Sequence, residues 1–154
     1  MQSRVELILA STSSRRRKLL DQLGILYTSQ VPIVDELPVA QEKPARYVRR
    51  IARAKAEDVW ASSMQCLPVL AADTIIALDE VILGKPQDRQ MAEHYLNMLS
   101  GREHQVLTAL CLRTIEGVYE SRVNIMVYFR DITPCELEAY CSTPEPFDKA
   151  GAYA

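Results

Sequence analysis

Hydroxyl and guanidinium groups are concentrated in one short segment near the start of the sequence. Ser11–Ser14 precede Arg15–Arg17, between a short apolar run and a helical pattern. Free N–H groups and the positive end of the dipole make a helix N-terminus a ready anion site, and hydroxyl and guanidinium groups suit phosphate oxygens. Successive helical residues point about 100° apart, so the three arginines do not all face one ligand. The segment predicts an anion site, although a plain helix cap with a solvated basic face also fits these residues.

Carboxylates follow two of the apolar runs. Asp73 comes directly after Leu67–Ala72 and before Thr74, and Asp35 and Glu36 follow an earlier run. Open α/β sheets place their ligands at the carboxyl ends of strands. A carboxylate at such a position can bind a divalent cation or take a proton from an attacking water. Asp73 also fits an acid that merely closes a strand, and Asp35 and Glu36 also fit ordinary loop charges.

Two lysines complete the set of residues suited to phosphate chemistry. Gly84 allows close approach of the backbone and Lys85 offers a mobile positive charge, although a surface turn explains both. Lys55 lies at the flank of the apolar stripe of a long predicted helix, where its side chain can point inward. His94 and His104 are ten residues apart, one on a helix and one near the start of a strand, and we interpret both as structural.

Apolar periodicity predicts the elements that position these residues. Short apolar or alternating runs indicate strands, and the predicted strands are Val5–Ala10, Leu26–Ile33, Leu67–Leu78 with a return arm at Glu80–Leu83, Val106–Leu112 and Val123–Phe129. Helical spacing and capping residues indicate the helices. They are expected after the helix-starting residues Ser11–Ser13 and up to Gly24, from Pro44 onward, over Met91–Leu99, and from the Thr133–Glu136 capping box to about Cys141. The order β-α-β-α-β(β)-α-β-β-α predicts one mixed α/β layer structure.

Two of these predictions concern how elements are exposed. The stripe of the long helix is expected to be buried, and it consists of Val48, Ile51, Ala52, Ala56, Val59 and Trp60. Alternation in Val123–Phe129 predicts a strand with one wetter face. The tail from Pro144 to Ala154 is typical of a loop.

The length and composition of the chain exclude several classes of protein. The 154 residues suit a single domain, and 18 Lys+Arg against 20 Asp+Glu give a formal charge of −2, without the broad basic surface of a nucleic-acid binder. No stretch approaches the length of a membrane span, and the apolar run Leu7–Ala10 is too short for a signal peptide. The four cysteines show no metal-binding spacing, so free thiols in a reducing cytosol are expected.

Several motifs together resemble one known family. They are Leu7–Arg17 with Leu19 and Leu20, Ala72–Thr74, Leu83–Pro86, Leu99–Arg102 with His104, and Asp148–Tyr153. In this order and at this approximate spacing they resemble the Maf family of nucleoside triphosphate pyrophosphatases. The resemblance covers essentially the whole chain.

The resemblance implies a Maf/ITPase-like α/β fold, in which helices flank a mixed β-sheet, in a cytoplasmic and often dimeric enzyme. Such enzymes cleave a nucleoside triphosphate between its α and β phosphates with a divalent cation, here Mg²⁺ or Mn²⁺. By position, Asp73 matches the proton acceptor of the family. The resemblance also implies catalytic roles for Lys55 and Lys85, a phosphate site that includes Ser11 and Arg16, and metal ligation by Asp35, Glu36 and Asp73.

Three positions bear on the base of the nucleotide. Arg15 and Thr74 resemble the branch of the family that acts on dTTP and UTP, whereas the branch acting on 7-methyl-GTP typically carries Trp and Gln there. Lys149, within Asp148–Tyr153, also suits the first branch. The resemblance therefore favours dTTP and UTP as substrates.

The chain departs from the family pattern at two places. Ser14 stands where the family usually has Pro, which should only loosen the entry to the helix. Ala154 stands where the family has Gly, followed by Ile-Gln-Gly, a strand and a helix, so the last strand and helix of the fold are expected to be missing from this chain. Two alternatives therefore stay open: a truncated, inactive nucleotide-binding protein or cell-division regulator, and a pyrophosphatase for modified nucleotides.

Overall fold

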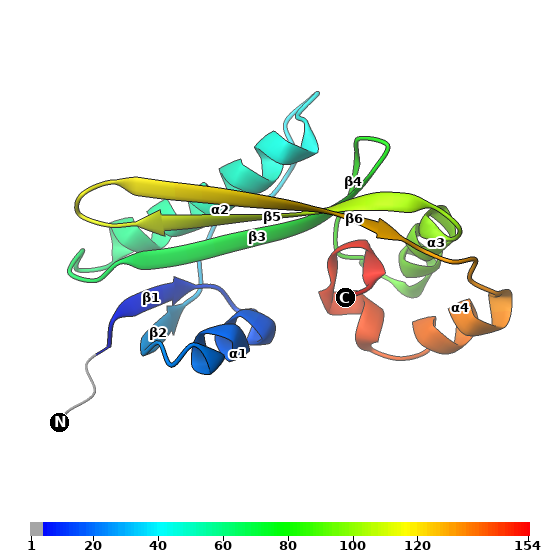
Figure 1. Ribbon diagram of the computed structural model, residues 1–154, viewed down its shortest axis with the longest axis horizontal. Coiled ribbons are helices and arrows are strands. Elements are labelled where there is room, and N and C mark those ends of the chain that lie inside the picture. The colour runs from blue at the N-terminus through cyan, green and yellow to red at the C-terminus, as the bar shows by residue number, and fades with distance from the viewer. Residues whose placement is uncertain (1–4) are drawn as a thin grey trace. The chain divides into compact units, whose positions relative to one another are not determined.

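The computed structural model describes residues 5–154 and has the predicted order of strands and helices (Figure 1). The strands are β1 (Leu7–Ala10), β2 (Tyr27–Gln30), β3 (Val69–Leu78), β4 (Val81–Leu83), β5 (Glu103–Arg113) and β6 (Val118–Tyr128). The helices are α1 (Ser14–Gln22), α2 (Pro44–Ser62), α3 (Arg89–Leu99) and α4 (Pro134–Cys141), followed by the short 3₁₀ turns η1 (Glu145–Asp148) and η2 (Ala150–Ala152). Within residues 5–154, no helix combines the length and the apolar character needed to cross a membrane.

The strands of residues 5–154 form one mixed sheet in the order β2-β1-β3-β5-β6, with β4 paired to β3. β1 runs parallel to both β2 and β3, so that Ala10 lies opposite Gln30 on one side and Ala71 on the other. β4 is the predicted return arm and runs antiparallel to β3. Because β1 ends at Ala10 while β3 continues to Leu78, Asp73 lies within a strand, two residues beyond the end of its parallel neighbour.

The described residues divide into two compact units. The first contains the described residues up to Glu42 together with Arg46–Asp73 and Ala109–Arg122, and the second contains Lys43–Ala45, Thr74–Thr108 and Val123–Ala154. A single domain over residues 1–154 stays a prediction, and its first four residues lie outside the described residues.

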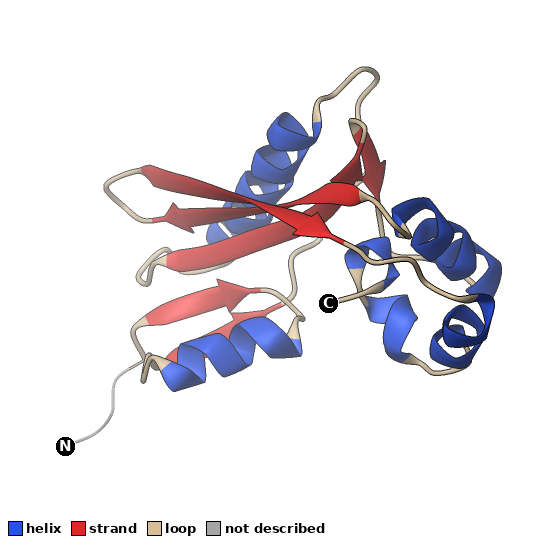
Figure 2. Cartoon of the chain, turned by 45° about the vertical axis from the view of Figure 1, so that its right-hand side comes forward, coloured by secondary structure: helices blue, strands red, loops and turns tan. Residues whose placement is uncertain are grey.

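The first unit contains β1, β2, the first part of β3 and all of α2 except its first two residues. Pro44 begins α2, as expected of a residue whose missing N–H costs nothing there. The predicted stripe of α2 is confirmed, since all six of its residues are buried. In β1 and β3, Leu9, Ala10, Val69 and Ala71 are also buried. In Figure 2, α1 connects β1 to its parallel neighbour β2.

The second unit has two clusters of buried apolar residues. One contains Ile76, Leu78, Leu83 and Leu99, and the other contains Ala92, Leu96, Cys141 and Ala152. The predicted capping box at the start of α4 is confirmed, because the side chains of Thr133 and Glu136 each bond the main chain of the other.

His104 is buried in the second unit among aromatic rings. Its Nε2 hydrogen-bonds the hydroxyl of Tyr153, and its ring lies edge-on to Phe129 at 5.0 Å between centroids. Burial lowers the pKa of His104. These contacts suit the structural role expected of this histidine, because it fastens the end of the described chain to β5.

The prediction of one wetter face on β6 is wrong. Both faces are exposed along most of the strand, including the apolar side chains of Tyr119, Val123, Ile125 and Met126. Among the described residues β6 is the last strand in the order and pairs with β5 alone, and little packs against either of its faces. Alternation of residue types indicates a strand but does not tell an edge strand from a covered one.

Candidate functional site

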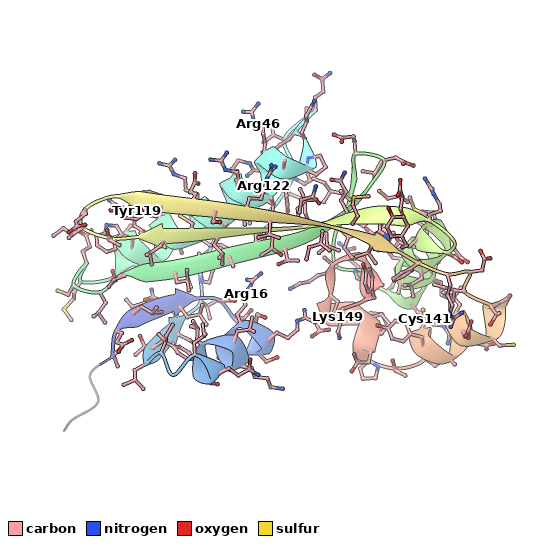
Figure 3. The ribbon with its side chains drawn as sticks, in the orientation of Figure 1. Arg16, Arg46, Tyr119, Arg122, Cys141 and Lys149 are labelled. Atoms are coloured by element: carbon pink, nitrogen blue, oxygen red, sulfur yellow. The ribbon has the colours of Figure 1, made fainter. Side chains whose placement is uncertain are left out.

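In the first unit, the chain passes directly from β1 into α1 at a point rich in hydroxyl groups. Ser13 is the N-cap of α1, and its hydroxyl accepts a hydrogen bond from the main-chain N–H of Arg16 at 3.5 Å. Ser11 is buried, and its Oγ accepts from Ser13 N at 3.1 Å and from Arg16 Nη1 at 3.2 Å. Arg15 and Arg17 are exposed. One guanidinium and one hydroxyl are therefore held together at the N-terminus of α1, the side chain of Arg16 being labelled in Figure 3.

A buried lysine joins two carboxylates in the same unit. Lys55, on α2, is only 8% exposed, and Asp73, on β3, is 6% exposed. Lys55 Nζ donates to Asp73 Oδ1 at 2.9 Å and lies 3.0 Å from Glu36 Oε1. The second oxygen of Asp73, Oδ2, is buried and has no hydrogen-bond partner among the described residues. This oxygen is thus a strong acceptor within a site that already contains a cation.

The charges around Asp73 oppose one another. Burial raises the pKa of Asp73, because desolvation penalises its charged form. The ammonium of Lys55 lowers it, Glu36 raises it, and Arg16 lowers it slightly. Burial likewise lowers the pKa of Arg16, and the charge of Asp73 opposes that effect. The carboxylate thus holds a proton more readily than an exposed aspartate does, which suits a base that must accept a proton from water.

Tyr47 belongs to the same cluster. It lies on α2 and is 7% exposed, and its hydroxyl donates to the main-chain carbonyl of Glu36 at 2.7 Å. Burial, and then the negative charges of Asp73 and Glu36, raise the pKa of Tyr47 to about 12. The phenol therefore stays protonated and remains a donor throughout the neutral range.

The other candidate residues lie in the second unit. Thr74 shares a hydrogen bond of 3.0 Å with the hydroxyl of Thr108, and Lys85 is exposed. Lys149, labelled in Figure 3, has its ammonium on Glu145 and Asp148. Gly151 N donates to Gly84 O at 2.9 Å, so the segments that carry Lys149 and Lys85 are joined through their main chains.

The whole pattern of these motifs also matches a family model. Residues 6–154 match the model described as Maf-like protein. The chain belongs to the Maf family. The match confirms the family that the sequence motifs indicated.

Two curated relatives of this chain share one name. A protein of Nitrosomonas europaea named dTTP/UTP pyrophosphatase is 50% identical, over 95% of this chain and 76% of that protein. A protein of the same name from Photobacterium profundum is 41% identical, over 98% of this chain and 80% of its own length. The absence of a last strand and helix stays a prediction.

Solved structures support the fold. The Staphylococcus aureus Ham1 protein is 15% identical and superposes with a TM-score of 0.52, over 80% of this chain and 71% of that one. At that identity the similarity bears on the fold alone. It agrees with the predicted Maf/ITPase-like class, in which helices flank a mixed sheet.

For this Maf chain, the predicted site residues fall into two sets. The first unit brings together Ser11 and Arg16, and it brings Glu36 and Asp73 onto Lys55. Asp35 is exposed and its Oδ1 accepts from Leu37 N at 2.9 Å, which makes a local turn. Thr74, Lys85 and Lys149 belong to the second unit, and their roles stay predictions.

Sequence reasoning missed Tyr47. The signal was present, because Tyr47, Ile51 and Lys55 are spaced four residues apart and such residues share one face of a helix. Starting from Lys55 and moving back two turns would have found it. The predicted apolar stripe of α2 does not include Tyr47, and no other pattern in the sequence assigned it a role.

Proposed function

We propose that this Maf chain is a nucleoside triphosphate pyrophosphatase that hydrolyses dTTP and UTP to the monophosphate and diphosphate. The names of its curated relatives support the substrate class. One observation carries the chemistry. Buried Lys55 lies within hydrogen-bonding distance of Asp73, whose second oxygen has no hydrogen-bond partner within residues 5–154.

In this proposal Ser11 and Arg16 hold phosphate oxygens. A triphosphate carries several negative charges, which must be offset before a water molecule can approach phosphorus. Arg16 supplies a guanidinium that Ser11 already orients, and the free N–H groups at the start of α1 point toward an anion. Lys85 supplies a further positive charge, and Lys55 supplies one beside Asp73.

Asp73 is the proposed general base. It takes one proton from the attacking water, the water oxygen forms a bond to phosphorus, and the bond to the leaving diphosphate breaks. The raised pKa of Asp73 makes it a better proton acceptor than an exposed aspartate, while the ammonium of Lys55 opposes that rise by favouring the charged form. Because Asp73 lies within β3, the strand fixes its position before substrate binds.

The residues fit a divalent cation, because Glu36 and Asp73 supply carboxylate oxygens and Asp73 Oδ2 lacks a hydrogen-bond partner among the described residues. Within residues 5–154, no three His, Cys, Asp or Glu side chains gather closely enough to hold an ion alone. Oxygens of the substrate phosphates are therefore expected to complete the coordination. When bound, Mg²⁺ or Mn²⁺ would offset phosphate charge and lower the pKa of water.

Arg15, Thr74 and Lys149 are the proposed contacts to the nucleotide that favour dTTP and UTP. We also propose that the chain works in the cytoplasm and forms a homodimer. The four cysteines are free, which suits a reducing compartment. No feature of the described residues favours the two alternative functions, an inactive nucleotide-binding protein or an enzyme for modified nucleotides.

The test is release of pyrophosphate from a panel of nucleoside triphosphates with Mn²⁺ or Mg²⁺. We expect the highest turnover on dTTP and UTP, and we expect Asp73→Asn to abolish it while nucleotide binding persists. Glu116→Gln makes the same carboxylate-to-amide change in the exposed turn between β5 and β6 and should leave turnover intact. Near-normal turnover by Asp73→Asn would show that Asp73 is not the base.

A further inference from the structure

The segment that carries Glu36 is held by polar contacts rather than by apolar packing. Residues 33–42, here called the strap, join β2 to α2 without forming a helix or strand. Most of the large apolar side chains along the strap point into solvent, since Ile33 is 86%, Leu37 73% and Val39 59% exposed, and Val34 is only half-buried. Burial of these side chains therefore cannot determine where the strap lies.

Hydrogen bonds to α2 determine it instead. At the start of the strap, Ile33 N donates to Asp58 Oδ2 at 2.8 Å. At its other end, Arg50 donates to both carboxylate oxygens of Glu42 at 2.7 Å and to Leu37 O at 3.0 Å. The side-chain hydrogen bond from Arg50 lowers the pKa of Glu42 to about 2, so this contact is charged in the neutral range. Asp58 and Arg50 thus attach the two ends of the strap to one helix.

Tyr47 fixes the point between these ends. Its hydroxyl donates to the carbonyl of Glu36 itself, and the ring is buried in the first unit. The only contact described for the carboxylate of Glu36 within residues 5–154 is the ion pair with Lys55, and that side chain is 55% exposed. Water screens a half-exposed ion pair, so Lys55 holds Glu36 weakly. The hydrogen bond from the Tyr47 hydroxyl therefore fixes the main-chain position from which the side chain of Glu36 extends.

We propose that Tyr47 is a positioning residue: its hydroxyl holds the main chain of Glu36 so that the carboxylate of Glu36 shares a divalent cation with Asp73. The inference rests on the proposed function for the role of that cation. Groups that orient a metal ligand without touching the metal contribute substantially to affinity, and their loss typically costs about 10–100-fold. Tyr47 acts through Glu36 and touches neither the cation nor the substrate.

The experiment measures binding of Mn²⁺ to the full chain saturated with a non-hydrolysable analogue of dTTP by titration calorimetry, together with kcat and KM for dTTP. Tyr47→Phe removes one hydroxyl and keeps the buried ring. We expect its Kd for Mn²⁺ to rise by about 10-fold, in the direction of Glu36→Gln, and kcat to fall with little change in KM. Arg50→Gln, which releases the end of the strap, should weaken Mn²⁺ binding in the same direction.

A matched control separates positioning from stability. Tyr140 makes the same kind of bond, since its hydroxyl donates to the carbonyl of Ala152 at 3.1 Å. Tyr140→Phe should lower the melting temperature as much as Tyr47→Phe does but leave the Kd for Mn²⁺ unchanged. Tyr47→Phe with the wild-type Kd, or a wild-type chain that binds Mn²⁺ no better than Glu36→Gln, overturns the inference. Failure of the proposed function would give a different result: the wild-type chain would release no pyrophosphate from any nucleotide.

Discussion

Replacing Lys55 by Met tests whether the charge cluster is as buried as the structure indicates. Methionine keeps most of the length of the side chain and removes the charge, which leaves the carboxylate of Asp73 buried without its closest cation. Breaking a buried ion pair in this way costs about 3–5 kcal/mol. The pair with Glu36 adds little, about 0–1 kcal/mol, because that carboxylate is half exposed. At roughly 2–4 °C for each kcal/mol, the melting temperature should fall by roughly 6–20 °C at neutral pH.

The pKa of Asp73 determines how the stability loss in Lys55→Met changes with pH. Burial already raises the pKa of Asp73, and removal of Lys55 takes away the largest effect that opposes it. A raised pKa means that the folded chain binds this proton more tightly than the unfolded chain. The loss of stability in Lys55→Met should therefore be small in acid, where Asp73 is protonated. It should reach its full size as pH rises through the raised pKa of Asp73.

The assay is urea unfolding of the wild-type chain, Lys55→Met, Asp73→Asn and the double variant, at neutral and at acid pH. The double-mutant cycle isolates the coupling between the two side chains. We expect a coupling of a few kcal/mol at neutral pH that shrinks in acid. A loss below about 1 kcal/mol in Lys55→Met, equal at both pH values, would be typical of an exposed pair and would refute the reasoning.

Three further changes test other parts of the structure. Because the side-chain hydrogen bond from Arg50 lowers the pKa of Glu42 from 4.5 to about 2, this contact should stabilise the chain above 4.5 and lose its effect as pH falls toward 2; Glu42→Gln should be less stable than wild type at neutral pH in acid-titration circular dichroism, and an equal difference at every pH would contradict this. Gly151→Ala should lower stability by about 1–3 kcal/mol, because φ is +63° and the new Cβ would lie 2.6 Å from Ile76 Cδ1; Ile76→Val should recover part of that loss in thermal unfolding, and no recovery would argue against the contact. Leu99→Ala should cost about 2–5 kcal/mol in urea unfolding, because Leu99 is fully buried in its cluster, and a cost below this range would contradict that burial.

Much of the fold was predictable because local signals agreed with one another. The order of elements, the start of α2 at Pro44 and the capping box at Thr133 follow from residue types that favour one local structure. Strand ends were less well predicted. The expected strand Leu26–Ile33 is only Tyr27–Gln30, and Pro32, which has no N–H to donate to a ladder, falls in the part that is not strand.

The candidate site was predictable in its residue types but not in its connections. Asp73, Lys55 and Glu36 were each singled out from the sequence, and the structure shows that one ammonium joins them. Pairing between residues far apart in the chain depends on tertiary packing, which local spacing does not encode. The same limit explains Tyr47, because a hydrogen bond from a helix to the carbonyl of a distant loop leaves no local pattern.

The location of Asp73 inside β3 also limits which insertions and deletions the sequence can tolerate. Side chains alternate between the two faces of a strand, so adding or deleting one residue between Val69 and Asp73 would turn the acid to the opposite face. The paired register with β1 allows no such slip. Length differences among descendants of this sequence should therefore accumulate in connecting segments, and this stretch of β3 should tolerate changes of residue type but not of number.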